Sequence, residues 1–432
     1  MKSLKVSLLI LLFVFSFFIK QGLTQDVSSI NSGDTAWVLI SSALVMLMTL
    51  PGLALFYGGL SKRKDTLNTI AMSFITYCLV SILWIVYGYT LSFGADVAGL
   101  IGNFSKLFLK GINLNSLSGT IPEFIFVMFQ LTFAAITVAL ISGAYIERLK
   151  FSVWICFSIL WFTFSYIPVA HWVWGGGFLS KLGALDFAGG TVVHINAGIA
   201  ALVGAMILKS RYDKAVIPHN LTLVVLGAGL LWFGWFGFNA GSALAANSLA
   251  SAAFLNTNTA TAMAALAWCF TEWLIFKKPT ILGLASGVVV VGLVAITPAA
   301  GFVNIKGAII IGLIAGILCF ISVAYVKPKL GYDDTLDVFG IHGVGGFIGA
   351  ILTGIFADPS IGGTAGLLYG NPKQLWIQII AAGTTVVYTA IVTAIIFGIL
   401  KIIFGNLRVP AGDELVGLDE TQHGEKAYNL HI

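Results

Sequence analysis

The sequence predicts an all-α membrane protein with eleven transmembrane helices, and three observations support this fold class. The chain has 432 residues, of which 58% are hydrophobic and only 9% are charged, whereas a soluble domain carries about 25% charged residues. Eleven apolar segments approach or exceed the length that crosses a bilayer, which is about 20 residues. Lysine and arginine are concentrated in alternate connections between these segments, as expected for a membrane protein that follows the positive-inside rule.

Residues 1–24 have the pattern of a cleaved signal peptide. Lys2 and Lys5 precede an apolar run of 14 residues, 6–19, which is short for a membrane span. Cleavage would place the mature N-terminus outside the cell. The alternative is that this run forms an additional first membrane helix.

Residues 25–404 are expected to form one membrane domain. Its apolar segments lie at approximately 36–58, 69–92, 122–145, 151–171, 190–208, 219–240, 252–275, 280–297, 306–326, 338–357 and 374–404. With the N-terminus outside, the inner connections and the tail carry fifteen Lys and Arg residues, against five in the outer connections. This asymmetry predicts a multi-pass protein of the cell membrane, taken here as a bacterial inner membrane, with residues 405–432 as a cytoplasmic tail.

Two stretches repeat one pattern and divide the chain into halves. Residues 186–204 read DFAGGTVVHINAGIAALVG, and residues 337–354 read DVFGIHGVGGFIGAILTG. Each carries an Asp, then a His, then a Gly four residues after the His. The stretches fall in the fifth and tenth segments, and two halves of five spans each must lie in opposite membrane orientations. We therefore expect an inverted 5+5 repeat, with the eleventh segment packed outside it.

His194 and His342 are the ionisable residues of this repeat. An ionisable side chain at membrane depth is costly, and it is by default a candidate functional residue. Two histidines at matching positions are expected to line a pore and to titrate as a pair, which suits the passage of a small polar solute. A hydrogen bond between helices is the ordinary role of a single membrane histidine, and ligation of haem is the competing use of two.

Aromatic residues and one serine form a second candidate site: Phe129 and Phe133 in the third segment, Trp174 after the fourth, and Trp235, Phe238 and Ser242 in the sixth. Phe129 and Phe133 share a helix face, as do Phe238 and Ser242. Ordinary packing explains most such stripes. The functional interpretation is a cup that binds a small cation by cation–π contacts on the outer side.

Other sequence features predict structure or exclude functions. Asp186 and Asp337 precede the two histidines and are expected to cap the helices that carry them. The sequence contains no phosphate-binding loop, nucleotide motif or nucleic-acid patch, and its four cysteines have no metal-ligand spacing. We therefore expect no cofactor, no metal, no nucleic-acid partner and no enzyme activity.

Six motifs together resemble the ammonium transporter (Amt) branch of the Amt/Rh superfamily, over residues 34–429. They are PGLALFYGGL (51–60), AHWVWGGGFL (170–179), DFAGGTVVHINAG (186–198), GWFGFNAGSA (234–243), DVFGIHGVGG (337–346) and GLDETQHGEKAY (417–428). The resemblance implies a homotrimer in the lipid membrane, with one pore per subunit that carries ammonium or ammonia.

The resemblance also implies a role for each candidate residue. Phe129, Trp174 and Ser242 match the outer site that recruits ammonium, and Asp186 matches an aspartate needed near it. Phe133 and Phe238 match the stacked pair that closes the pore; His194 and His342 match its twin histidines, with Trp235 beside them.

Three alternatives stay open at this point. Trp174 and Ser242 favour the Amt branch over a gas channel of the Rh branch, which lacks this pair. The tail motif implies a docking surface for a PII-type signalling protein, so an ammonium sensor with the same fold is also possible. A membrane electron carrier is the alternative from the enzyme class.

Overall fold

The computed structural model describes residues 29–215, 217–286 and 291–428, so the expected signal peptide lies outside the described residues. Within them, ten helical runs are long and apolar enough to cross a membrane: Ser32–Leu60, Arg63–Phe93, Glu123–Tyr145, Phe151–Leu182, Gly190–Leu208, Leu221–Gly241, Ser248–Phe276, Ile305–Leu330, Phe339–Phe356 and Pro372–Phe404. These ten correspond to ten of the eleven expected segments. The remaining one, 280–297, is described in two pieces.

Short π-helical turns interrupt three of the five spans in the first half and begin a fourth. The elements are α2 (Ser32–Leu47), η1 (Met48–Leu53) and α3 (Ala54–Leu60); α4 (Thr66–Leu83), η3 (Trp84–Gly88) and α5 (Tyr89–Phe93); α6 (Glu123–Tyr145); α7 (Phe151–Trp161), η5 (Phe162–Tyr166), α8 (Ile167–Val173) and α9 (Phe178–Leu182); and η6 (Gly190–Ile195) with α10 (Asn196–Leu208). Pro51 lies inside η1. Because proline has no N–H to donate, it disturbs the helix at this point.

The second half has the same kind of interruption. Its elements are α11 (Leu221–Gly241); α12 (Ser248–Phe276); α13 (Ile281–Ser286) and α14 (Leu293–Ile296); α15 (Ile305–Ile321), η8 (Ser322–Val326) and α16 (Lys327–Leu330); η9 (Phe339–Gly343) and α17 (Val344–Phe356); and α19 (Pro372–Phe404). Helices α13 and α14 lie on either side of residues 287–290 and make up the segment expected at 280–297.

The remaining described elements are short and lie in connections or in the tail. Strand β1 (Asp96–Val97) pairs antiparallel with β2 (Ile101–Gly102), and β3 (Leu117–Ser118) pairs antiparallel with β4 (Ile121–Pro122). Helix α18 (Pro359–Gly362) precedes α19, and the tail contains α20 (Ala411–Val416) and η11 (Asp419–His423).

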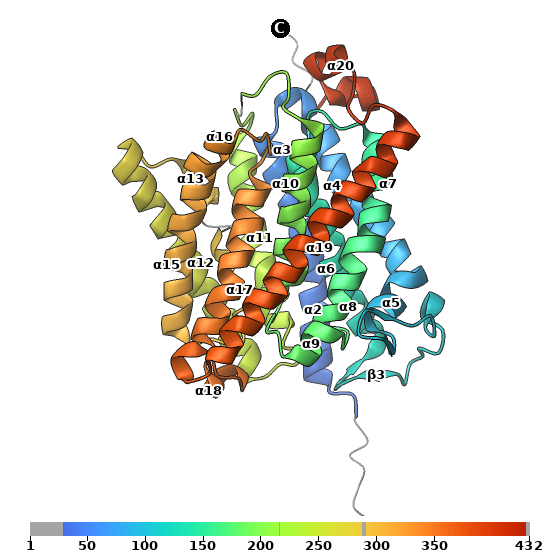
Figure 1. Cartoon of the computed structure of the whole chain (residues 1–432), viewed down its shortest axis with the longest axis vertical. Coiled ribbons are helices and arrows are strands. Elements are labelled where there is room, and N and C mark those ends of the chain that lie inside the picture. Colours follow the sequence, from blue (N-terminus) through green and yellow to red (C-terminus); the bar gives the residue numbers. More distant parts are fainter. Residues whose placement is uncertain (1–28, 216, 287–290, 429–432) are drawn as a thin grey trace, which may run out of the picture.

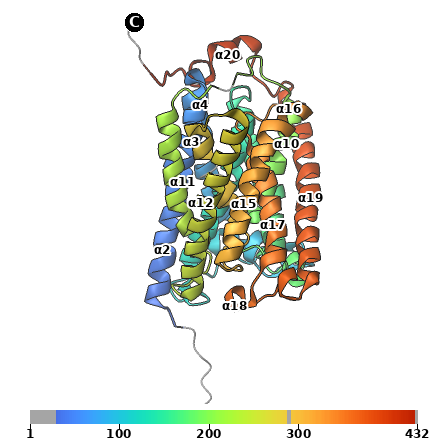
Figure 2. The same cartoon turned by 90° about the vertical axis from the view of Figure 1, so that its left-hand side faces the viewer.

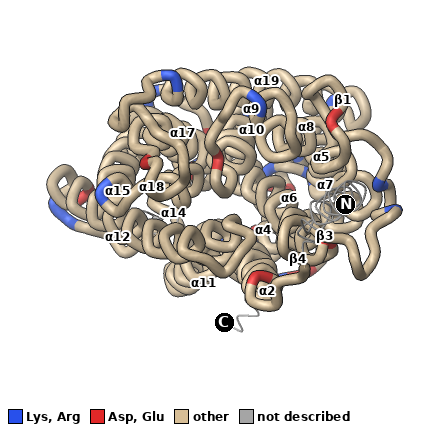
Figure 3. The backbone as a smooth tube through the Cα atoms, turned by 90° about the horizontal axis from the view of Figure 1, so that it is seen from below, with Lys and Arg blue, Asp and Glu red and all other residues tan. Residues whose placement is uncertain are grey.

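The helices form one upright bundle. The start of α2 and the strands lie at its lower end, and α20 lies at its upper end (Figure 1). Seen from below, α2 and α11 lie on one side and α10 and α19 on the other (Figure 3), and the side view agrees (Figure 2). The first described helix therefore begins at the end of the bundle opposite the tail.

Helix α6 is the central helix and α19 is an outer one. Over the most apolar 18-residue stretch of each helix, 89% of the residues of α6 are buried, whereas only 28% of those of α19 are buried. Helix α19 runs diagonally across the bundle and contacts α7, α10 and α17 (Figure 1). It therefore holds the two halves together from outside, as expected for a segment without a partner in the repeat.

Candidate functional site

The two interrupted helices of the repeat meet at glycines. A Cβ atom added to Gly198 would lie 2.2 Å from the backbone nitrogen of Gly343, and one added to Gly346 would lie 2.9 Å from the carbonyl oxygen of Gly190. Such distances are too short for any side chain. Gly198 and Gly346 each follow a histidine by four residues, so these glycines allow the close approach of the segments that carry the histidines.

The two histidines contact each other at this crossing. His194 Nδ1 lies 3.1 Å from His342 Nδ1, and the ring centroids are 5.2 Å apart. One Nδ1 must carry a proton and donate it to the other. His194 is fully buried and His342 is 3% exposed, and His194 Nε2 has no hydrogen-bond partner among the described residues. The pair therefore leaves a free ring nitrogen in an apolar environment.

Trp235 packs against the His194 side of this pair. Its ring stacks on His194 with centroids 5.4 Å apart and an angle of 18° between the planes. Its Nε1 donates to Thr297 Oγ1 at 2.9 Å, and Thr297 Oγ1 also lies 3.2 Å from Asn239 Oδ1. Thr297 and Asn239 were not predicted as site residues. The sequence feature that could have identified them is that each is a polar residue inside an apolar segment.

The histidine pair leaves no room for an iron between its Nδ1 atoms. Two metal–nitrogen bonds of about 2 Å each would need a separation of about 4 Å, which exceeds the 3.1 Å observed. The geometry therefore argues against an iron shared between these two Nδ1 atoms.

Phe133 and Phe238 pack against each other, and Phe238 lies beside His194. Their ring centroids are 4.2 Å apart and the rings are tilted by 30°. Both side chains are almost completely buried, and Phe238 is 6.1 Å from His194 between centroids. The two rings therefore close the space between the histidines and an outer cavity.

The outer cavity has a volume of about 320 Å³ and is lined by Phe93, Phe126, Gln130, Phe133, Val173, Trp174, Asp186, Phe187, Ser242, Leu244 and Phe302. Trp174 meets Phe133 edge-on with centroids 5.8 Å apart. Ser242 Oγ donates to the carbonyl oxygen of Phe238 at 2.8 Å, which leaves the oxygen lone pairs available to a cation.

Phe129 lies behind this cavity rather than in its wall. Its ring packs edge-on against Phe133 with centroids 4.9 Å apart, and the side chain is 1% exposed. Gln130 does line the cavity, and it was not predicted. A polar residue directly after Phe129 in an apolar span was the sequence feature that marks it.

Asp186 is a buried carboxylate at the start of η6. Its two oxygens accept four backbone N–H groups, at 2.6–3.0 Å, from Gly189, Gly190, Thr191 and Val192. Burial raises the pKa of Asp186 to about 6, and the four N–H groups oppose this rise. The expected capping role is therefore confirmed, and Asp186 also lines the outer cavity.

The matching expectation for Asp337 is wrong. Asp337 Oδ1 accepts from Lys327 Nζ at 2.5 Å, and the residue has a positive φ of 59°. The carboxylate that caps η9 is Asp334, whose Oδ2 accepts the N–H of Phe339 at 2.7 Å. The sequence did contain the indication, because Asp334 precedes His342 by the same eight residues that separate Asp186 from His194.

Comparison with known proteins assigns this chain to a family. The model of the Ammonium Transporter Family matches residues 36–428. The chain belongs to the ammonium transporter family. It is therefore a multi-pass membrane protein of a transporter family, and the resemblance drawn from its motifs is confirmed.

Relatives match the chain over nearly its whole length. An ammonium transporter of Aquifex aeolicus is 62% identical over 405 residues, which cover 93% of this chain and 95% of the relative. An ammonium transporter of Bacillus subtilis is 52% identical over 401 residues, covering 92% and 98%.

Solved structures agree with the helical membrane fold. Saccharomyces cerevisiae Mep2 has 36% sequence identity and a TM-score of 0.83, with 89% of each chain covered. A sensor Amt protein has 30% identity and a TM-score of 0.83, covering 90% of this chain and 98% of that one.

Proposed function

We propose that this protein carries ammonium across the cell membrane along a path from the outer cavity, past Phe133 and Phe238, to the histidine pair. The observation that carries this proposal is the 3.1 Å contact between His194 and His342. This contact lies next to the packed rings of Phe133 and Phe238. The family and its relatives support ammonium as the substrate.

The outer cavity is proposed to collect the cation. Trp174 offers a π-face, Ser242 an oxygen lone pair and Asp186 a nearby carboxylate. A cation–π contact is worth about 0.5–2 kcal/mol. These contributions suffice to bind and select a small cation from water, and Phe129 supports the ring of Phe133 from behind.

The ion is proposed to lose its proton before it passes the phenylalanines. Transfer of an unpaired ion into an apolar medium costs tens of kcal/mol, which the cup cannot offset. Neutral ammonia carries no charge, so this transfer cost does not apply to it. It can exchange hydrogen bonds with the imidazole nitrogens of His194 and His342. Whether the proton follows along the histidine pair decides whether transport carries net charge.

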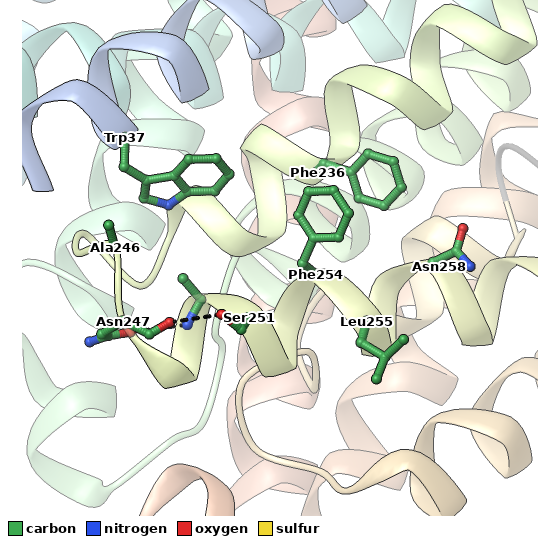
Figure 4. Close-up of a pocket in the computed structure, with 9 residues that line it drawn as sticks. Trp37, Phe236, Ala246, Asn247, Ser251, Phe254, Leu255 and Asn258 are labelled. Carbon is green, nitrogen blue, oxygen red and sulfur yellow. Dashed lines mark hydrogen bonds between the residues drawn. The ribbon is translucent and has the colours of Figure 1, made fainter. Parts of the chain in front are cut away.

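Assembly as a homotrimer is part of this proposal, and one outer face supports a protein neighbour. A cavity of about 560 Å³ opens between α2, α11 and α12, lined by Trp37, Phe236, Ala246, Asn247, Ala250, Ser251, Phe254, Leu255 and Asn258 (Figure 4). Asn258 lies in the span α12 and is exposed. Because an exposed amide is costly against lipid tails, we propose that a second subunit covers this face.

The tail is proposed to bind a cytoplasmic signalling protein of the PII type. Three contacts hold it against its own subunit. Asp419 Oδ1 accepts the N–H of Asn68 at 2.8 Å, and Lys64 Nζ donates to the carbonyl oxygen of Glu414 at 3.0 Å. Tyr428 Oη lies 3.1 Å from His219 Nε2. A tail with a fixed position can present a surface to a partner. Residues 25–404 then act as the transport domain, after a cleaved signal peptide.

Purified protein in proteoliposomes tests the proposal. Ammonium applied to the outer side should evoke a current, or, if ammonia alone crosses, an internal alkalinisation without current. Absence of both signals in vesicles that contain folded protein would reject transport and leave a sensor role as the alternative.

A further inference from the structure

The inner histidine has a buried carboxylate eight residues before it, as the outer histidine does. Asp186 precedes His194 and Asp334 precedes His342. Asp334 is fully buried, and Asp186 is 7% exposed. The two carboxylates therefore occupy equivalent places in the two halves, but only Asp186 faces the outer cavity.

Asp334 holds the first turn of η9. Its Oδ2 accepts the N–H of Phe339, the first residue of that turn, at 2.7 Å. An acidic group at this place satisfies an N–H that has no partner inside the helix, and it interacts favourably with the positive end of the helix dipole. His342 follows Phe339 by three residues, so the carboxylate and the imidazole are joined by a single helical turn.

The backbone around Asp334 is itself fixed from two sides. Arg148, which follows α6 and is fully buried, donates to the carbonyl oxygen of Asp333 at 2.5 Å and to Thr335 Oγ1 at 2.8 Å. Lys327 Nζ donates to the carbonyl oxygen of Asp334 at 2.6 Å. The carboxylate is thus attached to a rigid support rather than to a free loop.

The charge of Asp334 has few direct partners. Its Oδ1 is buried and has no hydrogen-bond partner within the described part of the chain. This contrasts with the four N–H groups on Asp186. A buried carboxylate with an unfilled oxygen is costly, so the bond from Oδ2 to the N–H of Phe339 is the main contact by which this carboxylate acts on η9.

We infer that Asp334 is a positioning residue for transport, which sets the height and rotation of η9 so that His342 Nδ1 meets His194 Nδ1. This inference rests on the proposed function and adds an inner counterpart to Asp186. A hydrogen bond of 3.1 Å between ring nitrogens tolerates only a small displacement of either ring. Loss of the cap therefore affects the histidine pair and leaves the outer cavity unchanged.

Two substitutions separate the acceptor from the charge. Asp334→Asn keeps an oxygen that can accept the N–H of Phe339, whereas Asp334→Leu has a similar volume and no acceptor. Since a displacement of about 1 Å can reduce a rate about a hundredfold, Asp334→Leu should lower the maximum transport rate by about ten- to a hundredfold. Asp334→Asn should retain more of the rate. The half-saturating ammonium concentration should stay as in wild type, because Trp174 and Ser242 are untouched.

Asp337→Asn is the matched control. Asp337 lies three residues further along. Its carboxylate pairs with Lys327, and only its backbone carbonyl, which Asp337→Asn leaves in place, accepts an N–H of η9, from Ile341 at 3.0 Å. The variant should therefore keep the wild-type maximum rate. A structure of Asp334→Leu gives a readout independent of transport, and the two Nδ1 atoms should lie beyond hydrogen-bond distance. If Asp334→Leu does not fold, Asp334→Ala, which also lacks an acceptor for the N–H of Phe339, serves for both measurements.

Two results would overturn the inference. One is an unchanged histidine contact in a variant that has lost the cap. The other is a fall in maximum rate that is equally large in Asp337→Asn. Failure of wild-type transport would instead reject the proposed function, while the structural readout would still decide whether Asp334 positions His342.

Discussion

Gly198 lies against Gly343 so closely that a Cβ atom on Gly198 would come within 2.2 Å of the backbone nitrogen of Gly343. The helices that carry the two histidines cross at this point. Backbone atoms cannot yield as a flexible side chain can, so the identity of residue 198 determines how near the histidines come to each other.

Gly198→Ala is therefore predicted to separate the two interrupted helices. The strain should cost about 3 kcal/mol of stability and abolish transport, measured as thermal unfolding and as ammonium-evoked current. Gly383→Ala is the control, because Gly383 lies in α19 with no atom near its would-be Cβ. That variant should be neutral or slightly stabilising. Equal behaviour of the two variants would contradict this account of the crossing.

Replacement of both histidines tests the pore. Because His194 and His342 provide ring nitrogens in an otherwise apolar path, the double variant His194→Ala with His342→Ala should lose ammonium-evoked current. The protein should still fold, as judged by size-exclusion elution and thermal unfolding. An unchanged current in the folded double variant would remove the pair from the mechanism.

The outer site should tolerate mutation with a graded loss of selectivity. Trp174→Leu removes a π-face and Ser242→Ala removes an acceptor, each worth about 1 kcal/mol. The apparent affinity for ammonium should fall about fivefold in each, and discrimination against other small cations should weaken. Trp376→Leu, the same exchange at a 65% exposed position of α19, should change neither. Wild-type selectivity in Trp174→Leu would argue against the site.

Transport should depend on outer pH through Asp186. Burial raises the pKa of this carboxyl to about 6, against the effect of its four N–H partners. The carboxyl is thus ionised above about pH 6 and neutral below it, and the outer cavity loses its negative charge on acidification. Apparent affinity for ammonium should fall as outer pH drops through about 6. Asp186→Asn should show low affinity throughout and no such transition; a wild-type pH profile in this variant would assign the transition to another group.

Removal of residues 413–432 tests the tail. The truncation deletes Glu414, Asp419 and Tyr428, which hold the tail to its own subunit. The protein should remain folded, show altered activity and lose binding to a PII protein in pull-downs. Tyr428→Phe, which removes only the contact with His219, should have a smaller effect. If the truncated protein binds PII as strongly as wild type, the cytoplasmic connections at 61–66 and 209–218 become the candidate docking surface.

Local sequence determined the membrane spans and much of the site. Hydropathy and charge depend on each segment by itself, so ten of the eleven expected segments appear as continuous helical runs. The repeated His and Gly spacing also identified the pair at the crossing, because each half carries its own copy of the pattern. The outer position of α19 followed from its lack of a counterpart.

Tertiary structure alone decided which polar groups meet. His194 and His342 are 148 residues apart, and Trp235 and Thr297 are 62 apart, so no local pattern specifies these contacts. Asp337 fitted the sequence pattern of a cap, yet a positive φ and an ion pair with Lys327 turn it away, and Asp334 takes its place. Spacing along one helix likewise placed Phe129 with Phe133, but packing of neighbouring helices left only Phe133 in the cavity wall. Helix periodicity fixes which residues share a face, whereas the neighbour that covers each part of that face depends on how the whole chain packs.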